Sequence, residues 1–417
     1  MVNRFFFLFL SLALISCSSK IDVGIDLDSL KNEGDLFKQN ENLIFLDKKI
    51  EKINSIIMPD NKSGNINFSS LTKKKFFSPL KNNNFKKEII NYNDKIIYID
   101  DQSNLYIINK KLKSQKKIKI LNKDIKNFPI KFSLLIDNDI LYGADNFGSI
   151  FSFDLKNNDF LWHNFLNVPF FSNIVSYKDY IFALNANGKI FSFSKLDGKV
   201  IWSQEIGSGI IKSYDSFKIL NVKDKLVFTN DLGFVYCLDL LNKNSVWSLK
   251  IPLKKSKTSN SVLKLSNLVF DEKFIYISSN LGGFLKIDLN TGEIIWSLNI
   301  FSNQPIFVSK KHISLLTTNG FLTIVNKNSS EVMFNKNLKI IKSLKKNAAS
   351  DIEFLDFFSS GKYLYIFSNF GDLLIFDSFN LKSINYKNIS NLITSNIVKI
   401  NEFVYFLADE GRLYQYK

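Results

Sequence analysis

The 417-residue sequence is poor in the residue types that carry most metal and nucleophilic chemistry. It contains two cysteines and two histidines, and His163 and His312 are far apart in the chain. A structural zinc site takes about four Cys or His ligands, so a histidine-based metal cluster is disfavoured. Cys237 lies in the apolar run "FVYCLDL" and is interpreted as a buried thiol rather than a nucleophile. We expect no catalytic residues and no disulfide within the mature chain.

The sequence also has one long apolar run, and it lies at the N-terminus. Phe5 to Ile15 follow Arg4 and precede Cys17, which predicts an export signal that is too short to span a membrane as a helix. The tetrapeptide "LISC" at 14–17 resembles the lipobox of bacterial lipoproteins, whose cysteine is acylated and becomes the first mature residue. We therefore expect a signal peptide at 1–16 and lipidation of Cys17. An ordinary signal peptide ending near Ser16, or a short anchor, is the alternative.

Residues 17–73 lack the pattern found in the rest of the chain and are rich in Asn, Lys, Asp and Ser. This composition predicts a flexible, lipidated tether. The stretch "NLIFLDKKIEKINSIIM" at 42–58 is more apolar, and two alternatives are left open for it: one short helix, or a segment that becomes ordered only on a partner. Because Ser18 follows the lipidation site, in place of the aspartate associated with inner-membrane retention, the resemblance to lipoproteins implies the outer membrane.

Tryptophan is scarce, and its four copies are regularly placed. Each follows a turn glycine by 14 residues, so that Gly148, Gly188, Gly233 and Gly282 precede Trp162, Trp202, Trp247 and Trp296. The series of turn glycines continues with Gly320, Gly371 and Gly411, and Ser103 stands in the first position. Spacings of 38 to 51 residues between these anchors indicate an internal repeat with eight copies.

Each copy has an aliphatic residue seven positions before the anchor, from Ile96 in the first to Val404 in the last. Runs of β-branched and aromatic residues alternate with Asn, Asp, Gly and Lys, which is typical of strands and tight turns. Four strands per repeat predict an all-β fold, an eight-bladed β-propeller of four-stranded antiparallel blades. The tryptophans are expected on the outermost strands, covering the gaps between blades. Recurring aspartates, at Asp154, Asp239, Asp288 and Asp377, favour turn hydrogen bonding over an active site.

The eighth copy ends at Lys417 after its third strand. An unclosed ring would expose strand edges, so the missing strand is expected from the start of the repeats. The segment "KKFFSPLK" at 74–81 is predicted to be that strand, which sets the propeller at 74–417.

The formal charge of +16 would ordinarily suggest a nucleic-acid partner. The lysines are interspersed with asparagines in turns, and export separates the protein from nucleic acid, so this partner is disfavoured. The clusters "KKSK" at 254–257 and "KSLKK" at 342–346 are interpreted as solvated loops between blades, with an acidic partner or anionic lipid as the alternative.

The phrase "IDLNTGEIIW" at 287–296 resembles the repeat of pyrroloquinoline-quinone-type propellers. Eight such repeats behind a lipobox resemble the BamB family of outer-membrane assembly lipoproteins. This resemblance implies a scaffold without cofactor, anchored on the periplasmic face of the outer membrane. The implied partners are the periplasmic POTRA domains of the barrel-inserting protein BamA and other barrel-assembly components, with a monomeric propeller inside the complex.

The same resemblance points to a contact site at Ile210, Ile211 and Lys212, where family members carry two apolar residues and an arginine. Lysine cannot make the two-pronged contact of arginine, and an acidic pair expected in the next segment has no counterpart. A second interpretation places Ile210 and Ile211 at the start of an inner strand, facing the core. Two other functions remain open. One is a lipoprotein that binds another envelope protein or a polysaccharide. The other is a quinoprotein dehydrogenase, although this sequence has neither the adjacent pair of cysteines nor a convincing set of calcium ligands.

Overall fold

The structure is a computed structural model. It describes residues 74–77, 87–100, 102–109, 111–112, 114–120, 130–253, 262–340, 352–360, 363–377, 381–400, 403–408 and 412–416. Several of the predictions lie outside these residues: the signal peptide, Cys17, the tether with its 42–58 stretch, residues 78–81, both lysine clusters and Gly411.

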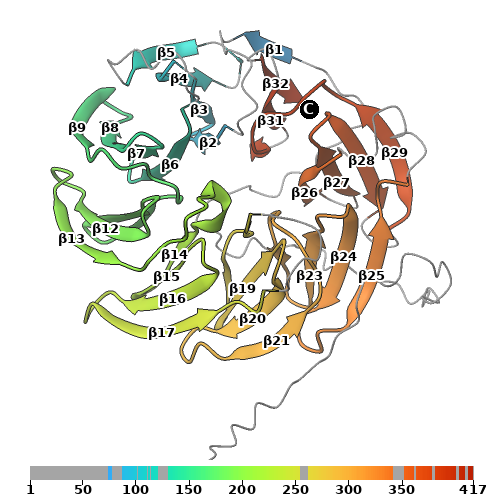
Figure 1. Ribbon diagram of the computed structural model, residues 1–417. Coiled ribbons are helices and arrows are strands. Elements are labelled where there is room, and N and C mark those ends of the chain that lie inside the picture. Colours follow the sequence, from blue (N-terminus) through green and yellow to red (C-terminus); the bar gives the residue numbers. More distant parts are fainter. Residues whose placement is uncertain are drawn as a thin grey trace, which may run out of the picture.

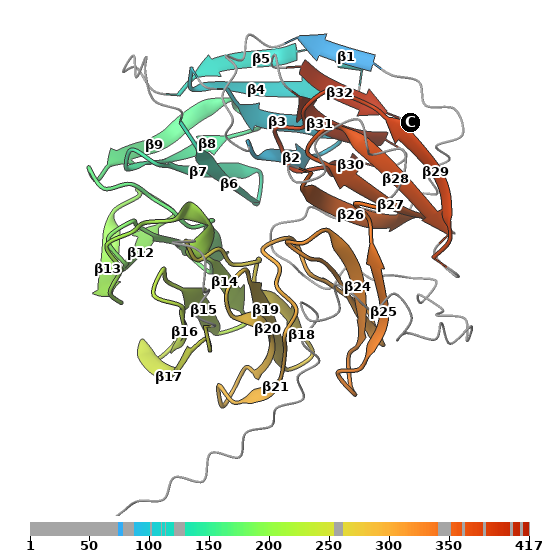
Figure 2. The same cartoon turned by 45° about the vertical axis from the view of Figure 1, so that its right-hand side comes forward.

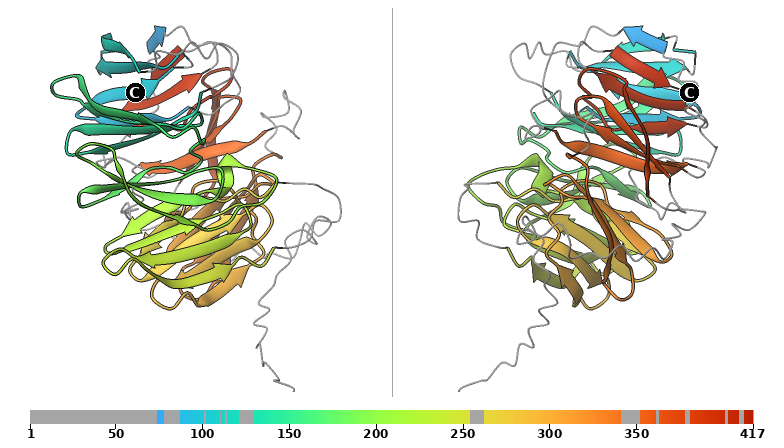
Figure 3. Two further views of the ribbon diagram at one scale, coloured as in Figure 1. Left: turned by 60° about the vertical axis from the view of Figure 1, so that its left-hand side comes forward. Right: turned by 90° about the vertical axis from the view of Figure 1, so that its right-hand side faces the viewer.

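The described strands form eight four-stranded antiparallel sheets arranged as blades around a ring. Figure 1 views the ring face-on, with the innermost strand of each blade toward the centre and the outermost strand at the circumference. Figure 2 shows the same ring turned by 45° about the vertical axis. The side views in Figure 3 show the strands crossing the ring between its two faces. The predicted eight-bladed β-propeller is confirmed.

In each blade the strands are named from the centre outward. Blades 1 to 4 consist of β2 (Ile89–Tyr92), β3 (Lys95–Ile99), β4 (Asn104–Asn109), β5 (Ser114–Lys119); β6 (Phe132–Asp137), β7 (Ile140–Asp145), β8 (Ser149–Asp154), β9 (Asp159–Phe165); β10 (Val175–Tyr177), β11 (Tyr180–Leu184), β12 (Lys189–Ser194), β13 (Val200–Glu205); and β14 (Ile219–Val222), β15 (Lys225–Thr229), β16 (Phe234–Asp239), β17 (Asn244–Lys250). Blades 5 to 8 consist of β18 (Val269–Asp271), β19 (Phe274–Ser279), β20 (Gly283–Asp288), β21 (Ile294–Leu298); β22 (Phe307–Val308), β23 (His312–Leu316), β24 (Phe321–Asn326), β25 (Val332–Asn337); β26 (Phe354–Ser360), β27 (Tyr363–Ser368), β28 (Asp372–Asp377), β29 (Ser383–Asn388); and β30 (Val398–Ile400), β31 (Phe403–Ala408), β32 (Arg412–Tyr416), β1 (Lys74–Phe77).

The core lies between blades, because adjacent sheets pack face to face. The two middle strands of a blade are therefore buried on both sides, as in β12, whose four central residues are all buried. The outermost strand has one face toward solvent, and in β9 exposed residues alternate with covered ones. This difference explains why the middle strands are continuous apolar runs, while apolar and polar residues alternate along the last strand.

Closure of the ring follows the prediction. Strand β1 pairs antiparallel with β32, from Lys74 opposite Gln415 to Phe77 opposite Arg412, so the earliest described strand completes the last blade. Blades 8 and 1 are also joined at the inner end, where the Asn396 side chain accepts from the Ile89 amide and donates to the Ile89 carbonyl, both at 2.9 Å.

The anchor position of the repeat requires a left-handed backbone, which glycine adopts without steric cost. Gly148 has φ 95°, and Ser103, standing in glycine's place, has φ 60°. In blade 5 the left-handed residue is Gly283 (φ 75°) instead of Gly282. Gly282 is needed for another reason, because a Cβ there would lie 2.4 Å from Ile251.

The recurring aspartates hydrogen-bond the turn that joins the third and fourth strands of a blade. Asp154 accepts from the amides of Lys156 (2.7 Å) and Asn157 (2.9 Å). Asp239 and Asp288 do the same in their own blades. Their repetition is therefore a property of the turn.

Two of the four tryptophans connect their blade to the next one. The Trp162 indole donates to the Lys195 carbonyl at 2.8 Å, and the ring lies against Gly198, where a Cβ would be 2.4 Å from it. Trp247 repeats the arrangement with the Leu289 carbonyl, also at 2.8 Å, and Gly292. The glycine in the "DG" or "TG" turn thus leaves the space in which the tryptophan of the preceding blade packs.

Trp296 has the same place on blade 5 but a different neighbour. Seven residues after the turn glycine of blade 6 is the Lys327 carbonyl, the counterpart of the acceptors used by Trp162 and Trp247. Here the Lys286 ammonium donates to it instead, at 3.1 Å, and the buried Trp296 indole nitrogen has no partner in the described structure. Lys286 also lies over the Phe274 ring of its own blade at 4.0 Å, so the lysine hydrogen bond replaces the tryptophan hydrogen bond between blades 5 and 6.

Candidate partner-binding site

The candidate site lies on the linker that joins blade 3 to blade 4. Ile210, Ile211 and Lys212 lie between the end of β13 and the short helix η3 (Tyr214–Ser216), and β14 begins only at Ile219. Ile210 is 99% exposed, Ile211 is 64% exposed, and Lys212 is exposed. The interpretation that the two isoleucines begin an inner strand and face the core is therefore wrong.

The start of this linker is held by side chains of blade 4. The Tyr236 hydroxyl donates to the Ile206 carbonyl at 3.0 Å, and the Asn230 amide donates to the Gly207 carbonyl at 3.1 Å. The Gly209 amide donates to Asp231 at 2.9 Å. Three successive attachments fix the backbone immediately before Ile210, which therefore projects from a supported loop.

The end of the linker contacts blades on both sides of it around the ring. The Tyr214 ring packs on Phe171 with centroids 3.8 Å apart, and the Lys131 ammonium lies 4.9 Å from it. On the other side, Ser216 donates to the Leu263 carbonyl at 2.5 Å, before blade 5. This one linker thus contacts elements of blades 2 through 5, so a partner bound to it would sit over several blades at once.

Two further exposed leucines lie on the same rim. Leu232 (41% exposed) contacts the linker near Gly209, and Leu253 (38% exposed) packs beside Gly233. Sequence reasoning missed both. The sequence has no signal that singles out Leu232, because the corresponding turn positions of blades 2, 5 and 7 are also apolar, at Phe147, Leu281 and Phe370. An apolar centre with Lys212 beside it has the composition of a protein interface.

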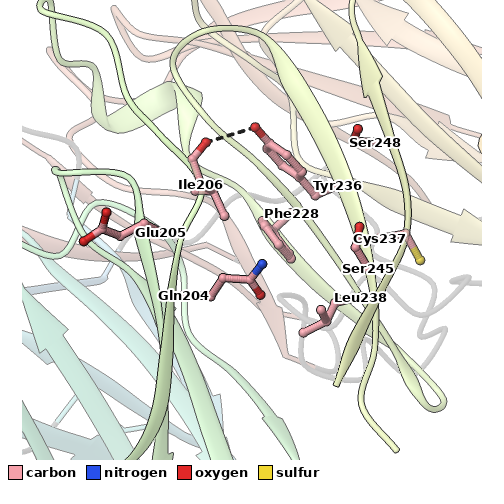
Figure 4. A pocket seen from close by; sticks show the side chains of 9 residues that line it. All are labelled: Gln204, Glu205, Ile206, Phe228, Tyr236, Cys237, Leu238, Ser245 and Ser248. Atoms are coloured by element: carbon pink, nitrogen blue, oxygen red, sulfur yellow. Dashed lines mark hydrogen bonds between the residues drawn. The ribbon is translucent and has the colours of Figure 1, made fainter. Parts of the chain in front are cut away.

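A small pocket of about 130 Å³ lies behind the linker, between blades 3 and 4. Figure 4 shows Gln204 and Ile206 on one side and Phe228, Tyr236 and Leu238 on the other, with the Tyr236–Ile206 hydrogen bond at its edge. Its volume is well below that of the pockets that usually hold cofactors. We assign it no ligand.

Cys237 lines this pocket, but its sulfur faces the Leu289 carbonyl of blade 5 at 3.9 Å. The residue is 1% exposed, and burial raises the pKa of the thiol to about 11. A protonated, covered thiol is a poor nucleophile, which agrees with its interpretation as part of the core.

The histidines lie on different blades, His163 on β9 and His312 on β23. The His163 Nε2 and Ser149 Oγ atoms are 2.6 Å apart. Ser149 is fully buried, so this pair cannot present its hydroxyl to a substrate. Within the described ranges no three His, Cys, Asp or Glu side chains are grouped as metal ligands, and no helix there has the length and apolar character to span a bilayer.

Comparison with known proteins gives a consistent result. Residues 130–336 match the family described as outer membrane protein assembly factor BamB. An uncharacterized protein of Rickettsia prowazekii (strain Madrid E) is 22% identical over 152 residues, which are 36% of this chain and 37% of that protein. The aligned part is therefore little more than a third of the relative's length.

Among solved structures, BamB from Moraxella catarrhalis superposes with a TM-score of 0.68 at 14% identity, covering 84% of this chain and all of that one. A quinohemoprotein alcohol dehydrogenase from Pseudomonas putida HK5 superposes with a TM-score of 0.61 at 9% identity, over 82% of this chain and 75% of the enzyme. At these identities the likenesses establish the propeller fold, which assembly factors and dehydrogenases share.

Proposed function

We propose that this chain, a BamB-like β-propeller of the pyrroloquinoline-quinone-type repeat family, is a scaffold lipoprotein of the outer-membrane β-barrel assembly machinery. It binds the periplasmic POTRA domains of BamA and performs no chemistry. In this proposal residues 1–16 are removed, Cys17 carries the lipid anchor on the periplasmic face of the outer membrane, 17–73 form the tether, and 74–417 the propeller.

The observation that supports the proposal best is the exposure of Ile210 and Ile211 on a supported linker. Leaving two isoleucines in water forgoes roughly 2–3 kcal/mol of burial for each. Their loop is already fixed by hydrogen bonds with the side chains of Tyr236, Asn230 and Asp231, so binding would cost little ordering entropy. A prepared loop with an apolar centre fits a protein partner better than a polysaccharide, which is bound mainly through polar groups.

The test is the double substitution Ile211→Asp and Lys212→Glu, followed by co-purification of BamA from detergent-solubilised envelopes. Because both side chains are exposed, we expect a normally folded protein, by circular dichroism and thermal unfolding, that no longer retains BamA. The matched control is Lys339→Glu with Ile340→Asp, which makes the same change on the linker after blade 6, where Ile340 is 68% exposed.

The control variant should retain BamA. Equal loss from both variants would indicate an unspecific effect of negative charge on the rim. Full retention by a folded Ile211→Asp, Lys212→Glu variant would remove this linker from the interface.

The enzyme alternative makes an opposite prediction. A quinoprotein dehydrogenase would bind pyrroloquinoline quinone saturably in the presence of calcium and reduce a dye when given substrate. We expect neither from the purified chain, and observing both would replace the scaffold proposal.

A further inference from the structure

The positive charge is concentrated in one segment of the sequence, contrary to the expectation that the lysines are scattered. Residues 73–119 contain thirteen lysines and four acidic residues, so 47 residues hold more than half of the formal charge of +16. Within this segment, residues 110–119 contain six lysines and no acidic residue.

The structure brings the two ends of this segment to one edge. β1 is the outermost strand of blade 8, and β5 is the outermost strand of blade 1. Figures 1 and 2 both show β1 and β5 next to each other along the circumference. We call this stretch of the circumference the basic edge.

The basic edge replaces tryptophan positions with lysines. In blade 1, Lys116 lies opposite Ile107, four residues after Ser103, and this is the position that tryptophan occupies in blades 2 to 5. In blade 8, Lys74 lies opposite Gln415, as Trp162 lies opposite Ser152 in blade 2. One position earlier than tryptophan, blades 2 to 6 carry an exposed apolar residue, whereas blade 1 carries the polar Gln115. The apolar residues are Leu161, Ile201, Val246, Ile295 and Met333.

The lysines of β5 face solvent. Lys116, Lys117 and Lys119 are exposed, and in the described part of the chain neither Lys117 nor Lys119 is paired with a carboxylate. The Lys117 ammonium lies 5.6 Å from the centroid of the Tyr106 ring, and the Lys119 ammonium donates to the Gln102 carbonyl. These contacts orient the side chains of Lys117 and Lys119 and leave their charges without a carboxylate partner among the described residues.

We propose that the basic edge is a contact surface for the anionic phosphate groups of a membrane, which orients the ring with blades 8 and 1 toward the lipid. Lysines near an anionic bilayer gain attraction from its surface potential, and the gain adds over neighbouring residues. The 73 residues that precede Lys74 enter the ring at this same edge, so the expected lipid anchor and the lysines would engage one surface. The proposal is independent of BamA binding and concerns a different side of the molecule from Ile210.

The test measures lysine acetylation in the full-length chain bound to phosphatidylcholine vesicles, with and without about one third phosphatidylglycerol. Mass spectrometry gives the rate at each lysine. We expect Lys116, Lys117 and Lys119 to react about fivefold more slowly on the anionic vesicles, and this protection to disappear at about 0.5 M salt. Lys310 and Lys311, exposed on blade 6, are references and should not change.

A triple variant, Lys116→Gln, Lys117→Gln and Lys119→Gln, should abolish the protection of the neighbouring Lys111. The matched variant Lys199→Gln, Lys243→Gln and Lys250→Gln removes the same charge from blades 3 and 4 and should retain it. Equal acetylation rates on the two kinds of vesicle, or equal protection of the reference lysines, would overturn the proposal. Protection of the three lysines by duplex DNA as strong as that by anionic vesicles would also overturn it, in favour of a general polyanion site.

Discussion

The indole of Trp247 lies directly on Gly292 of the following blade, so closely that a Cβ at this glycine would be 2.7 Å from the ring. The same indole donates to the Leu289 carbonyl, three residues before the glycine. The tryptophan of one repeat and the glycine turn of the next are therefore one interface, which explains why both residues belong to the same repeated phrase.

Gly292→Ala tests this contact. The substitution adds a methyl group against the Trp247 ring and also disfavours φ 76°, so we expect a loss of about 3 kcal/mol in the free energy of unfolding. Gly207 is a matched control, because its φ is also 76° and the nearest atom to an added Cβ is 3.9 Å away. Gly207→Ala should cost about 1 kcal/mol. Urea denaturation measures both losses of unfolding free energy. If the two variants lost similar amounts, backbone strain, and not the tryptophan contact, would set the cost.

Ring closure is tested by deleting residues 74–81. Without β1, strand β32 becomes the exposed edge of blade 8, and the ring is no longer tied from both ends. We expect a sharply lower melting temperature or aggregation during light-scattering measurements. Deletion of 22–60 removes more residues but no described strand, and it should leave the melting temperature unchanged. Normal stability after the first deletion would contradict closure by β1.

Asp145 should make stability depend on pH. Burial raises the pKa of its carboxyl from 3.8 to about 6, and its Oδ2 atom is buried with no hydrogen-bond partner among the described residues. Between these two values the folded protein holds a proton that the unfolded chain has released. Stability from this group is therefore greatest in acid and falls as the pH rises through about 6.

Asp145→Asn removes this dependence. Asparagine fits the position, since Asn185 occupies the same place in blade 3 and accepts from two amides at 3.0 Å. The variant should gain up to about 3 kcal/mol of stability above pH 6, with little gain near pH 4, in urea unfolding at both pH values. A gain of equal size at pH 4 would show that the carboxyl's ionisation is not its cause.

Lipidation is tested by Cys17→Ala. We expect the unaltered protein to incorporate labelled fatty acid and to fractionate with membranes, and the variant to lose the label. Cys237→Ala is the control, since the buried Cys237 should accept no label and its substitution should leave incorporation unchanged. Absence of label from the unaltered protein would exclude the lipoprotein proposal.

Much of the fold could be predicted from the sequence because each blade is built from contacts that are close in the chain. The turn glycines, the aliphatic position seven residues earlier and the tryptophan 14 residues later all fall within one repeat, so their recurrence alone determined the number of blades. The incomplete last copy also determined that a strand from the other end must close the ring. These features depend on contacts within one repeat or on the number of strands in each copy.

The tertiary structure decided what depends on neighbours distant in sequence. Whether Ile210 and Ile211 enter a strand or face solvent is set by Tyr236, Asn230 and Asp231 of the next blade, which hold the linker in place. Whether Trp296 binds its carbonyl is set by Lys286 and Lys327, on two different blades. Repeat position alone could not reveal this, because a hydrogen-bond donor from another strand takes the acceptor that the pattern assigns to the tryptophan. The basic edge likewise exists only because folding places β1, which precedes blade 1 in the sequence, beside β5, the outermost strand of blade 1.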